Sequence, residues 1–288
     1  MPTTKLIHFY QDKAVVVTGA ASGIGLALAH LFAELGCKLA LCDIDKKALN
    51  EVVKGIESTH PNTELYHSVL DVADEDAWVV FLAETAAALG GINLLINNAG
   101  IEGSGQPVWA STTASLKRVM DVNFYGMAYS TKHVLPYLSN EPWAALINVS
   151  SIFGLMAPPN TADYCASKFA IRGYTESLKA ELALVHPHIQ VHLVHPGGIN
   201  TNITRLEHSQ RFKERFLKTE PSALANKIAN AVMHNRARIV YGYQSQRARL
   251  AARILPLAWL SSLLGKLVKG LGLEDDYHKD HSGFTTRK

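Results

Sequence analysis

Cysteine is scarce in this sequence, and its net charge is low. The 288 residues include three cysteines, Cys37, Cys42 and Cys165, and no C-x-x-C pair. This set excludes a disulfide framework and is typical of a reducing compartment. A formal net charge of +3 is too small and too dispersed for a nucleic-acid-binding surface, so we expect no nucleic-acid partner.

Long apolar runs are also missing. No stretch reaches the roughly 18 apolar residues that a transmembrane helix needs, and residues 1–13 lack an apolar core of signal-peptide length. These absences predict a cytoplasmic protein. Because there is no internal repeat and no low-complexity linker, we expect one domain over 1–288. Its predicted parts are a core at about 13–245, a substrate loop at about 199–220 and a C-terminal helical extension at about 246–288.

Short apolar segments alternate with helical patterns along the chain. The segments are rich in Val, Ile and Leu and too short for helices, as in strands buried on both faces; they are 13–19, 37–43, 64–72, 92–100, 144–151, 189–198 and 238–242. Helical patterns cover 25–35, 74–89, 114–138, 164–185 and 222–235. The alternation predicts an α/β fold: one doubly wound Rossmann-type domain with a parallel sheet of about seven strands, helices on both faces and the C-terminal extension.

Three glycines stand between the first strand and the first helix of this pattern, in "TGAASGIG". Gly19 permits a tight turn, while Gly23 and Gly25 allow phosphates and a neighbouring strand to approach the backbone. The N–H groups at the helix start then face a pyrophosphate. The spacing G-x-x-x-G-x-G differs from G-x-G-x-x-G, so the motif alone indicates a nucleotide and no more.

Asp43 refines this prediction. It ends the second strand about twenty residues after the glycines, where a carboxylate can bind both hydroxyls of an adenosine ribose. A 2′-phosphate there would meet like charge, and neither Ser22 nor Ile44 supplies a compensating base. NAD is therefore favoured over NADP. The alternative is an Asp that only caps a turn, which is our interpretation of Asp45.

A second group of residues carries chemistry. "YCASK" places Tyr164 and Lys168 on one face of a helix. This pair alone is ordinary. The pair becomes informative because three more motifs accompany it after a nucleotide-binding turn. These are Ser151 in "NVSSIFG", Asn123 in "MDVNFYG" and the segment "NNAG" at 97–100.

These motifs, with "HPGGINT", resemble the short-chain dehydrogenase/reductase family from about Lys13 to Thr201. The resemblance implies an oxidoreductase acting on a CH–OH group, a homodimer or homotetramer, and the catalytic residues Ser151, Tyr164, Lys168 and Asn123. It implies a cofactor site of Gly19, Ser22, Gly23, Ile24, Gly25, Asp43, Asp71, Val72, Asn97, Ala99, Gly100, Tyr164, Lys168, Pro196, Gly197, Ile199 and Thr201. Ser151, Phe153 and Tyr164 would contact a small-molecule substrate.

The catalytic tyrosine must lose its proton near neutral pH. A lysine charge about 4 Å away, at an effective dielectric of about 20, stabilises the phenolate by roughly 4 kcal/mol. Burial acts in the opposite direction. We expect the lysine to outweigh burial, so that Tyr164 acts as a base.

The sequence indicates the substrate less closely than the cofactor. Phe153, Leu155, Met156, Ile203 and Leu206 predict an apolar pocket and a hydrophobic secondary alcohol or ketone of steroid, retinoid or long-chain type. An NADPH-dependent 3-oxoacyl or carbonyl reductase is the alternative enzyme. A dinucleotide-sensing or membrane-docked scaffold without turnover is the alternative of another class.

Two further segments invite functional interpretations. His186, His188, His192 and His195 lack metal-ligand spacing, so no metal site is predicted. The apolar stretch 252–270, with basic residues around it, could lie on a membrane surface; packing over the active site or against a second subunit is the favoured interpretation.

Overall fold

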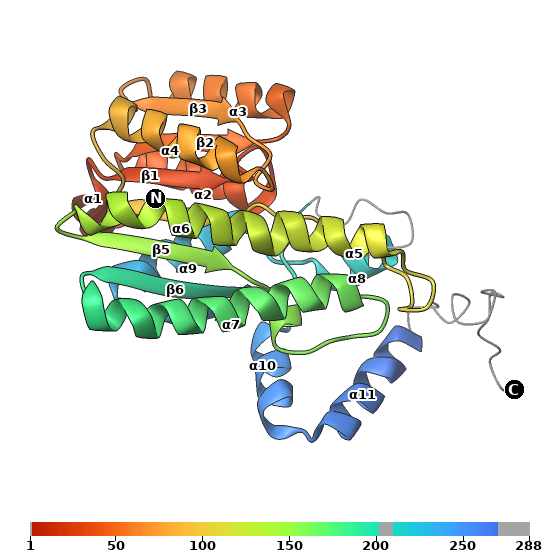
Figure 1. Ribbon diagram of the computed structural model, residues 1–288. Helices are drawn as coiled ribbons and strands as arrows, with labels where there is room; N and C mark the ends of the chain where they lie inside the picture. Colours follow the sequence, from red (N-terminus) through yellow and green to blue (C-terminus); the bar gives the residue numbers. More distant parts are fainter. Residues whose placement is uncertain (1, 202–209, 270–288) are drawn as a thin grey trace, which may run out of the picture.

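The computed structural model of the chain describes residues 2–201 and 210–269, and the predicted doubly wound α/β domain is confirmed (Figure 1). Seven parallel strands form one sheet in the order β3-β2-β1-β4-β5-β6-β7. The strands are β1 (Ala14–Thr18), β2 (Lys38–Asp43), β3 (Leu65–Val69), β4 (Leu94–Asn97), β5 (Ala144–Val149), β6 (Ile189–Pro196) and β7 (Arg238–Tyr241).

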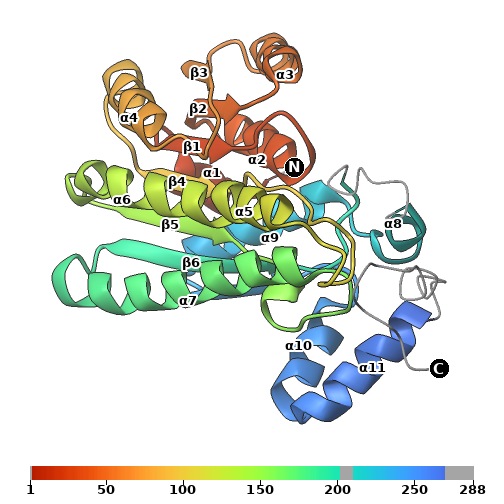
Figure 2. The ribbon, with the colours of Figure 1, turned by 45° about the vertical axis from the view of Figure 1, so that its right-hand side comes forward.

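Helices cover both faces of this sheet (Figures 1 and 2). One layer contains α2 (Gly23–Glu34), α3 (Lys46–Thr59) and α9 (Pro221–Met233); the other contains α4 (Glu75–Leu89), α5 (Thr113–Met120), α6 (Gly126–Ser139) and α7 (Ala162–Val185). Successive strand residues point to opposite layers. Val15 and Val17 pack in the α2 layer and Val16 in the α4 layer, which explains the continuous apolar strands of the sequence.

The predicted helix over 114–138 is interrupted. A π-helix, η1 (Asp121–Tyr125), joins α5 to α6, so one wider turn lies inside an otherwise continuous rod. The sequence pattern did not predict this turn, nor the helices α1 (Thr4–Tyr10), α3 and α8 (Gln210–Phe216). Asp45, predicted as a turn residue, caps α3 by accepting a hydrogen bond from Ala48 N at 3.0 Å.

The C-terminal extension begins as a helical hairpin, α10 (Ser245–Ile254) and α11 (Leu257–Lys269), that projects from the body of the domain (Figure 1). Residues 270–288 of the predicted extension and 202–209 of the predicted substrate loop, with Ile203 and Leu206, lie outside the described residues. Within the described ranges, no helix combines the length and the apolar character that crossing a membrane requires.

Candidate active site

A cavity of about 720 Å³ opens at the carboxyl edge of the sheet, where the chain order reverses between β1 and β4. Most predicted cofactor residues line it: Gly19, Ser22, Gly23, Ile24, Asp43, Asp71, Val72, Ala99, Gly100, Tyr164, Lys168, Pro196, Gly197, Ile199 and Thr201. The topology therefore brings residues from the ends of five strands, β1, β2, β3, β4 and β6, together with two residues of α7 at one site.

The glycine turn has the conformation that a phosphate cradle needs. Gly19 and Gly23 have φ values of +62° and +55°, which L side chains rarely adopt. Gly25 lies beneath the turn, and a Cβ there would overlap the carbonyl oxygen of Gly19. Ser22 precedes α2 without a side-chain capping hydrogen bond, and the first two residues of α2, Gly23 and Ile24, line the cavity, so the start of α2 is available to a ligand. These residues fit a dinucleotide pyrophosphate.

Asp43 stands at the end of β2 on the cavity wall. Its Oδ2 accepts a hydrogen bond from Ala21 N at 2.9 Å and its Oδ1 one from Asp45 N at 3.0 Å. A carboxylate has about four acceptor positions, so both oxygens can still accept from ribose hydroxyls. The backbone bonds fix the carboxylate beside the glycine turn, next to the uncharged Ser22 and Ile44.

One predicted cofactor residue is placed elsewhere. The Asn97 side chain does not line the cavity; it is buried between β4, β5 and α6, where it bonds Asn148, Ser130 and Thr131. The next residue, Asn98, lines the cavity and donates from Nδ2 to the carbonyl oxygens of Thr18 and Gly19, at 3.0 and 3.3 Å. Asn98 thereby ties the loop after β4 to the glycine turn.

The end of β5 positions the serine. Ser151 begins the short 3-10 helix η2 (Ile152–Gly154), and its Oγ accepts from Phe153 N at 3.1 Å. Its neighbour Ser150 instead donates to the carbonyl oxygen of Lys168 at 2.8 Å, which joins β5 to α7. Of the two hydroxyls, that of Ser151 can still donate to a ligand, and the predicted catalytic role of Ser151 stays a prediction.

Tyr164 and Lys168 both face the cavity from the first turns of α7. Lys168 Nζ lies 5.5 Å from the centre of the Tyr164 ring and donates to the carbonyl oxygen of Val149 at 3.2 Å. Burial raises the pKa of Tyr164 to about 12, against the opposing hydrogen bond with Ser151. Burial also lowers the pKa of Lys168 to about 8.

These pKa values differ from one expectation. Burial is the largest effect on both groups, because it disfavours the phenolate of Tyr164 and the ammonium of Lys168 alike. The expected lowering of the Tyr164 pKa by the lysine charge is therefore not seen in the chain by itself.

Asn123 sits in the π-helix η1 rather than on the cavity surface. Its Oδ1 accepts from Ile101 N at 2.8 Å, and its Nδ2 donates to the Ile101 carbonyl oxygen at 3.0 Å and to Ser167 Oγ at 3.1 Å. A Cβ at Gly100 would lie 3.2 Å from Asn123 Oδ1 and 3.4 Å from Lys168 Nζ. Gly100 therefore lets the loop after β4, Asn123 and Lys168 approach one another.

Comparison with known proteins agrees with this architecture. The family model "short chain dehydrogenase" matches residues 13–211. The chain belongs to the short-chain dehydrogenase/reductase family. It is an oxidoreductase of the class that acts on CH–OH groups.

Several relatives of this family cover most of the chain. The oxidoreductase SadH of Mycobacterium tuberculosis is 35% identical over 256 residues, which are 85% of this chain and 92% of that protein. Levodione reductase of Leifsonia aquatica is 28% identical over 228 residues, 77% of this chain and 83% of that protein. A short-chain dehydrogenase/reductase of Burkholderia phymatum, solved in complex with NAD, has a TM-score of 0.78 at 25% identity and covers 96% of this chain and 99% of that one.

Apolar residues also line the cavity. Phe153 and Met156 contribute from the segment after Ser151, whereas Leu155 does not line the cavity. The sequence did not predict the part of the wall that comes from α8 and α11, through Phe216, Leu260, Leu263, Leu264 and Leu267. One face of α11 therefore packs over the cavity, which is one of the two interpretations favoured for the C-terminal segment.

Two buried residues beside the site were not assigned a role from sequence. His195 Nδ1 donates to the carbonyl oxygen of Ser151 at 2.7 Å, so its tautomer is fixed, and burial lowers its pKa to about 4. Asp163, next to Tyr164, accepts from Ser104 N at 2.7 Å, Tyr164 N at 2.8 Å and Ser115 Oγ at 3.2 Å. No group of three metal-ligating side chains occurs in the described part of the chain.

Proposed function

We propose that the protein is an NAD-dependent dehydrogenase of hydrophobic secondary alcohols, or the reductase of the corresponding ketones. Asp43 carries the cofactor part of this proposal. Its carboxylate is held beside the glycine turn, where it can accept from two ribose hydroxyls and would repel a 2′-phosphate. The relative solved with NAD supports the same choice.

The residues around the catalytic end have distinct tasks in this proposal. When bound, the nicotinamide exchanges a hydride with the carbinol carbon and, in its oxidised form, adds positive charge to the site. Ser151 Oγ hydrogen-bonds the substrate oxygen. Tyr164 accepts the alcohol proton in oxidation and donates it in reduction. Lys168 binds the nicotinamide ribose hydroxyls and, in its charged form, stabilises the Tyr164 phenolate. Asn123 holds the loop after β4 in place through its hydrogen bonds to Ile101.

The apolar wall supports the substrate class. Phe153 packs edge-on against the Tyr164 ring, with ring centres 6.2 Å apart, and leucines of α11 line the same cavity, so a substrate with an alkyl or ring body would bury it there. Each CH₂ removed from water contributes about 0.8 kcal/mol, or roughly a fourfold gain in kcat/KM.

Binding titrations with NADH and NADPH test the cofactor. We expect NADH to bind at least tenfold more tightly, and Asp43→Asn to abolish that difference. Asp45→Asn is the matched control, because it removes the same charge two residues away and should leave the ratio unchanged. Equal or tighter binding of NADPH by the natural chain would overturn the assignment.

A series of secondary alcohols of increasing alkyl length tests the substrate class. With NAD⁺, kcat/KM should rise about fourfold per methylene until the cavity is filled. Leu264→Ser, on the apolar wall, should flatten this rise, whereas Leu184→Ser, at the far end of α7, should not. A preference for short or anionic alcohols would refute the hydrophobic pocket.

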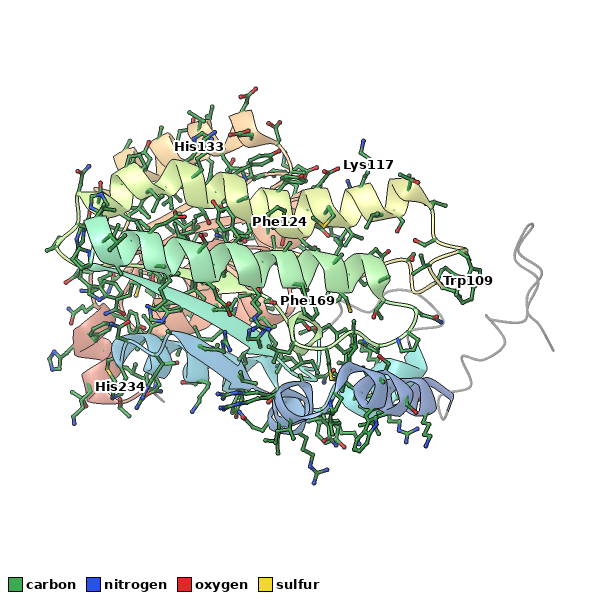
Figure 3. The ribbon with its side chains drawn as sticks, turned by 60° about the horizontal axis from the view of Figure 1, so that its bottom comes forward. Trp109, Lys117, Phe124, His133, Phe169 and His234 are labelled. Carbon is green, nitrogen blue, oxygen red and sulfur yellow. The ribbon has the colours of Figure 1, made fainter. Side chains whose placement is uncertain are left out.

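We also propose a homo-oligomer in a reducing compartment. The α5–η1 and α7 rods lie side by side and expose Leu116, Tyr125 and Phe169; Figure 3 labels Phe169 and the neighbouring Phe124. This face suits a second copy of the chain. All three cysteines are buried and unpaired, which suits a reducing environment. Light scattering on a size-exclusion column should give two or four chains, and a monomer would refute the oligomer.

A further inference from the structure

The α10–α11 hairpin has a second apolar surface that the active site does not use. Its inner side contributes Leu260 and Leu264, which are buried and line the cavity. Its tip, where α10 ends and α11 begins, stands away from the body of the domain in two views (Figures 1 and 2). The tip carries Ile254, Pro256, Leu257 and Trp259.

These tip residues are unusually exposed for their type. Leu257 is 79% exposed and Trp259 69% exposed, and Ile254 and Leu250 are exposed beside them on α10. None of the four lines the cavity. Clusters of exposed large apolar side chains mark interaction surfaces. The tip thus offers an apolar edge to a partner outside the domain.

The charges around this edge select the partner. Residues 245–269 contain five basic residues, Arg247, Arg249, Arg253, Lys266 and Lys269, and no acidic residue. Arg247 lines the cavity, whereas Arg249 and Arg253 lie on α10 beside the exposed apolar residues and do not line it. An isologous contact with a second copy would bring the same basic residues together and is disfavoured. An anionic lipid surface satisfies both features, because it attracts the basic residues and accepts Leu and Trp at the headgroup boundary.

We propose that the hairpin tip docks the protein on anionic membrane surfaces. The tip inserts Leu257 and Trp259 among the lipids, and Arg249 and Arg253 of α10 contact the phosphates. The cavity wall and the docking edge then belong to one hairpin, so apolar substrates dissolved in the membrane lie close to the cavity. The docking itself does not depend on the proposed substrate.

Co-sedimentation of the full chain with vesicles tests the proposal. We expect binding to phosphatidylcholine vesicles that contain 30% phosphatidylglycerol, at about 0.1 M salt, and much weaker binding to pure phosphatidylcholine or at about 1 M salt, where charges are screened. The double variant Leu257→Ser/Trp259→Ser should bind at least tenfold more weakly. Arg249→Gln/Arg253→Gln should lose roughly fivefold per residue.

Leu184→Ser is the matched control. Leu184 is 85% exposed at the opposite end of α7, so its loss changes surface hydrophobicity without changing the hairpin. All variants are first checked for unchanged Tm and NADH binding. Failure of the natural chain to sediment with anionic vesicles would overturn the proposal. An equal loss of vesicle binding in the tip variant and in Leu184→Ser would overturn it as well. The same holds for a dimer that depends on the tip residues and forms without vesicle binding.

Discussion

Asp163→Ala is the substitution that most directly tests how α7 is connected to the loop after β4. The Asp163 carboxylate is 4% exposed and joins three segments: α7 through Tyr164 N, α5 through Ser115 Oγ, and the loop after β4 through Ser104 N. A Cβ at Gly103 would overlap this carboxylate, so the loop packs closely on it.

The cost of the substitution follows from these contacts. Alanine removes all three hydrogen bonds and leaves the Ser104 N–H without its acceptor, which together lower the free energy of unfolding by about 3 kcal/mol. Asp163→Asn can keep its amide oxygen at the position of Oδ2, where it still accepts from Ser104 N and Ser115 Oγ and loses only the bond from Tyr164 N, so we expect a loss of about 1 kcal/mol. In a chain of this size, the alanine variant should melt roughly 9 °C lower.

Urea unfolding followed by tryptophan fluorescence measures these values, and steady-state kinetics give the functional effect. The loop after β4 lines the cavity through Ile101 and Glu102, so a loosened loop should raise KM more than it lowers kcat. An alanine variant within about 0.5 kcal/mol of the natural protein, with unchanged KM, would refute the role assigned to Asp163.

Three further predictions concern the site. Tyr164→Phe should abolish turnover and leave NADH binding nearly unchanged, as measured by stopped assays and titration; retained turnover would contradict the catalytic assignment. Because the pKa of Lys168 is lowered to about 8, its charged form falls from most of the population at pH 7 to about one-tenth at pH 9. NADH affinity should fall about tenfold over that range, and Lys168→Met should bind weakly at every pH; a pH-independent affinity in the natural chain would argue against the ribose contact. Gly25→Ala should remove NADH binding and lower stability by about 3 kcal/mol because its Cβ overlaps Gly19 O. Gly173→Ala, in open space on α7, should instead stabilise by about 1 kcal/mol, and a similar effect of both alanines on chemical unfolding would contradict this explanation.

The sequence was sufficient to predict the sheet because its strands are buried on both sides. In the sequence, such strands are uninterrupted apolar runs, for example residues 14–17, and helical patterns alternate with these runs regularly. The catalytic set came from the resemblance of several motifs to one family, and spacing contributed only the shared helical face of Tyr164 and Lys168. The structure brings both into one cavity with Ser151.

Other features depend on tertiary contacts that a pattern does not show. Asn97 and Asn98 are adjacent, and only the end of β4 decides which side chain turns into the core and which toward the glycine turn. The pKa of Tyr164 reflects how much protein covers the phenol, not the identity of its neighbours alone. The role of Asp163 requires the loop 101–111 to fold back on α7, and the cavity wall from α11 requires the chain to return after β7.

The single wide turn of η1 has a consequence for how this protein can change. A π-turn amounts to one extra residue inserted into a helix. Because the wide turn takes up the extra residue, α5 and α6 keep their buried faces on either side of it. Deleting one residue among 121–125 would therefore restore a regular α-helical turn and leave α6 packed on β4 and β5. The same deletion would shift Asn123 away from Ile101 and Ser167, because Asn123 lies inside the wide turn. The extra residue thus serves the position of Asn123 and of the loop after β4, and not the packing of α6.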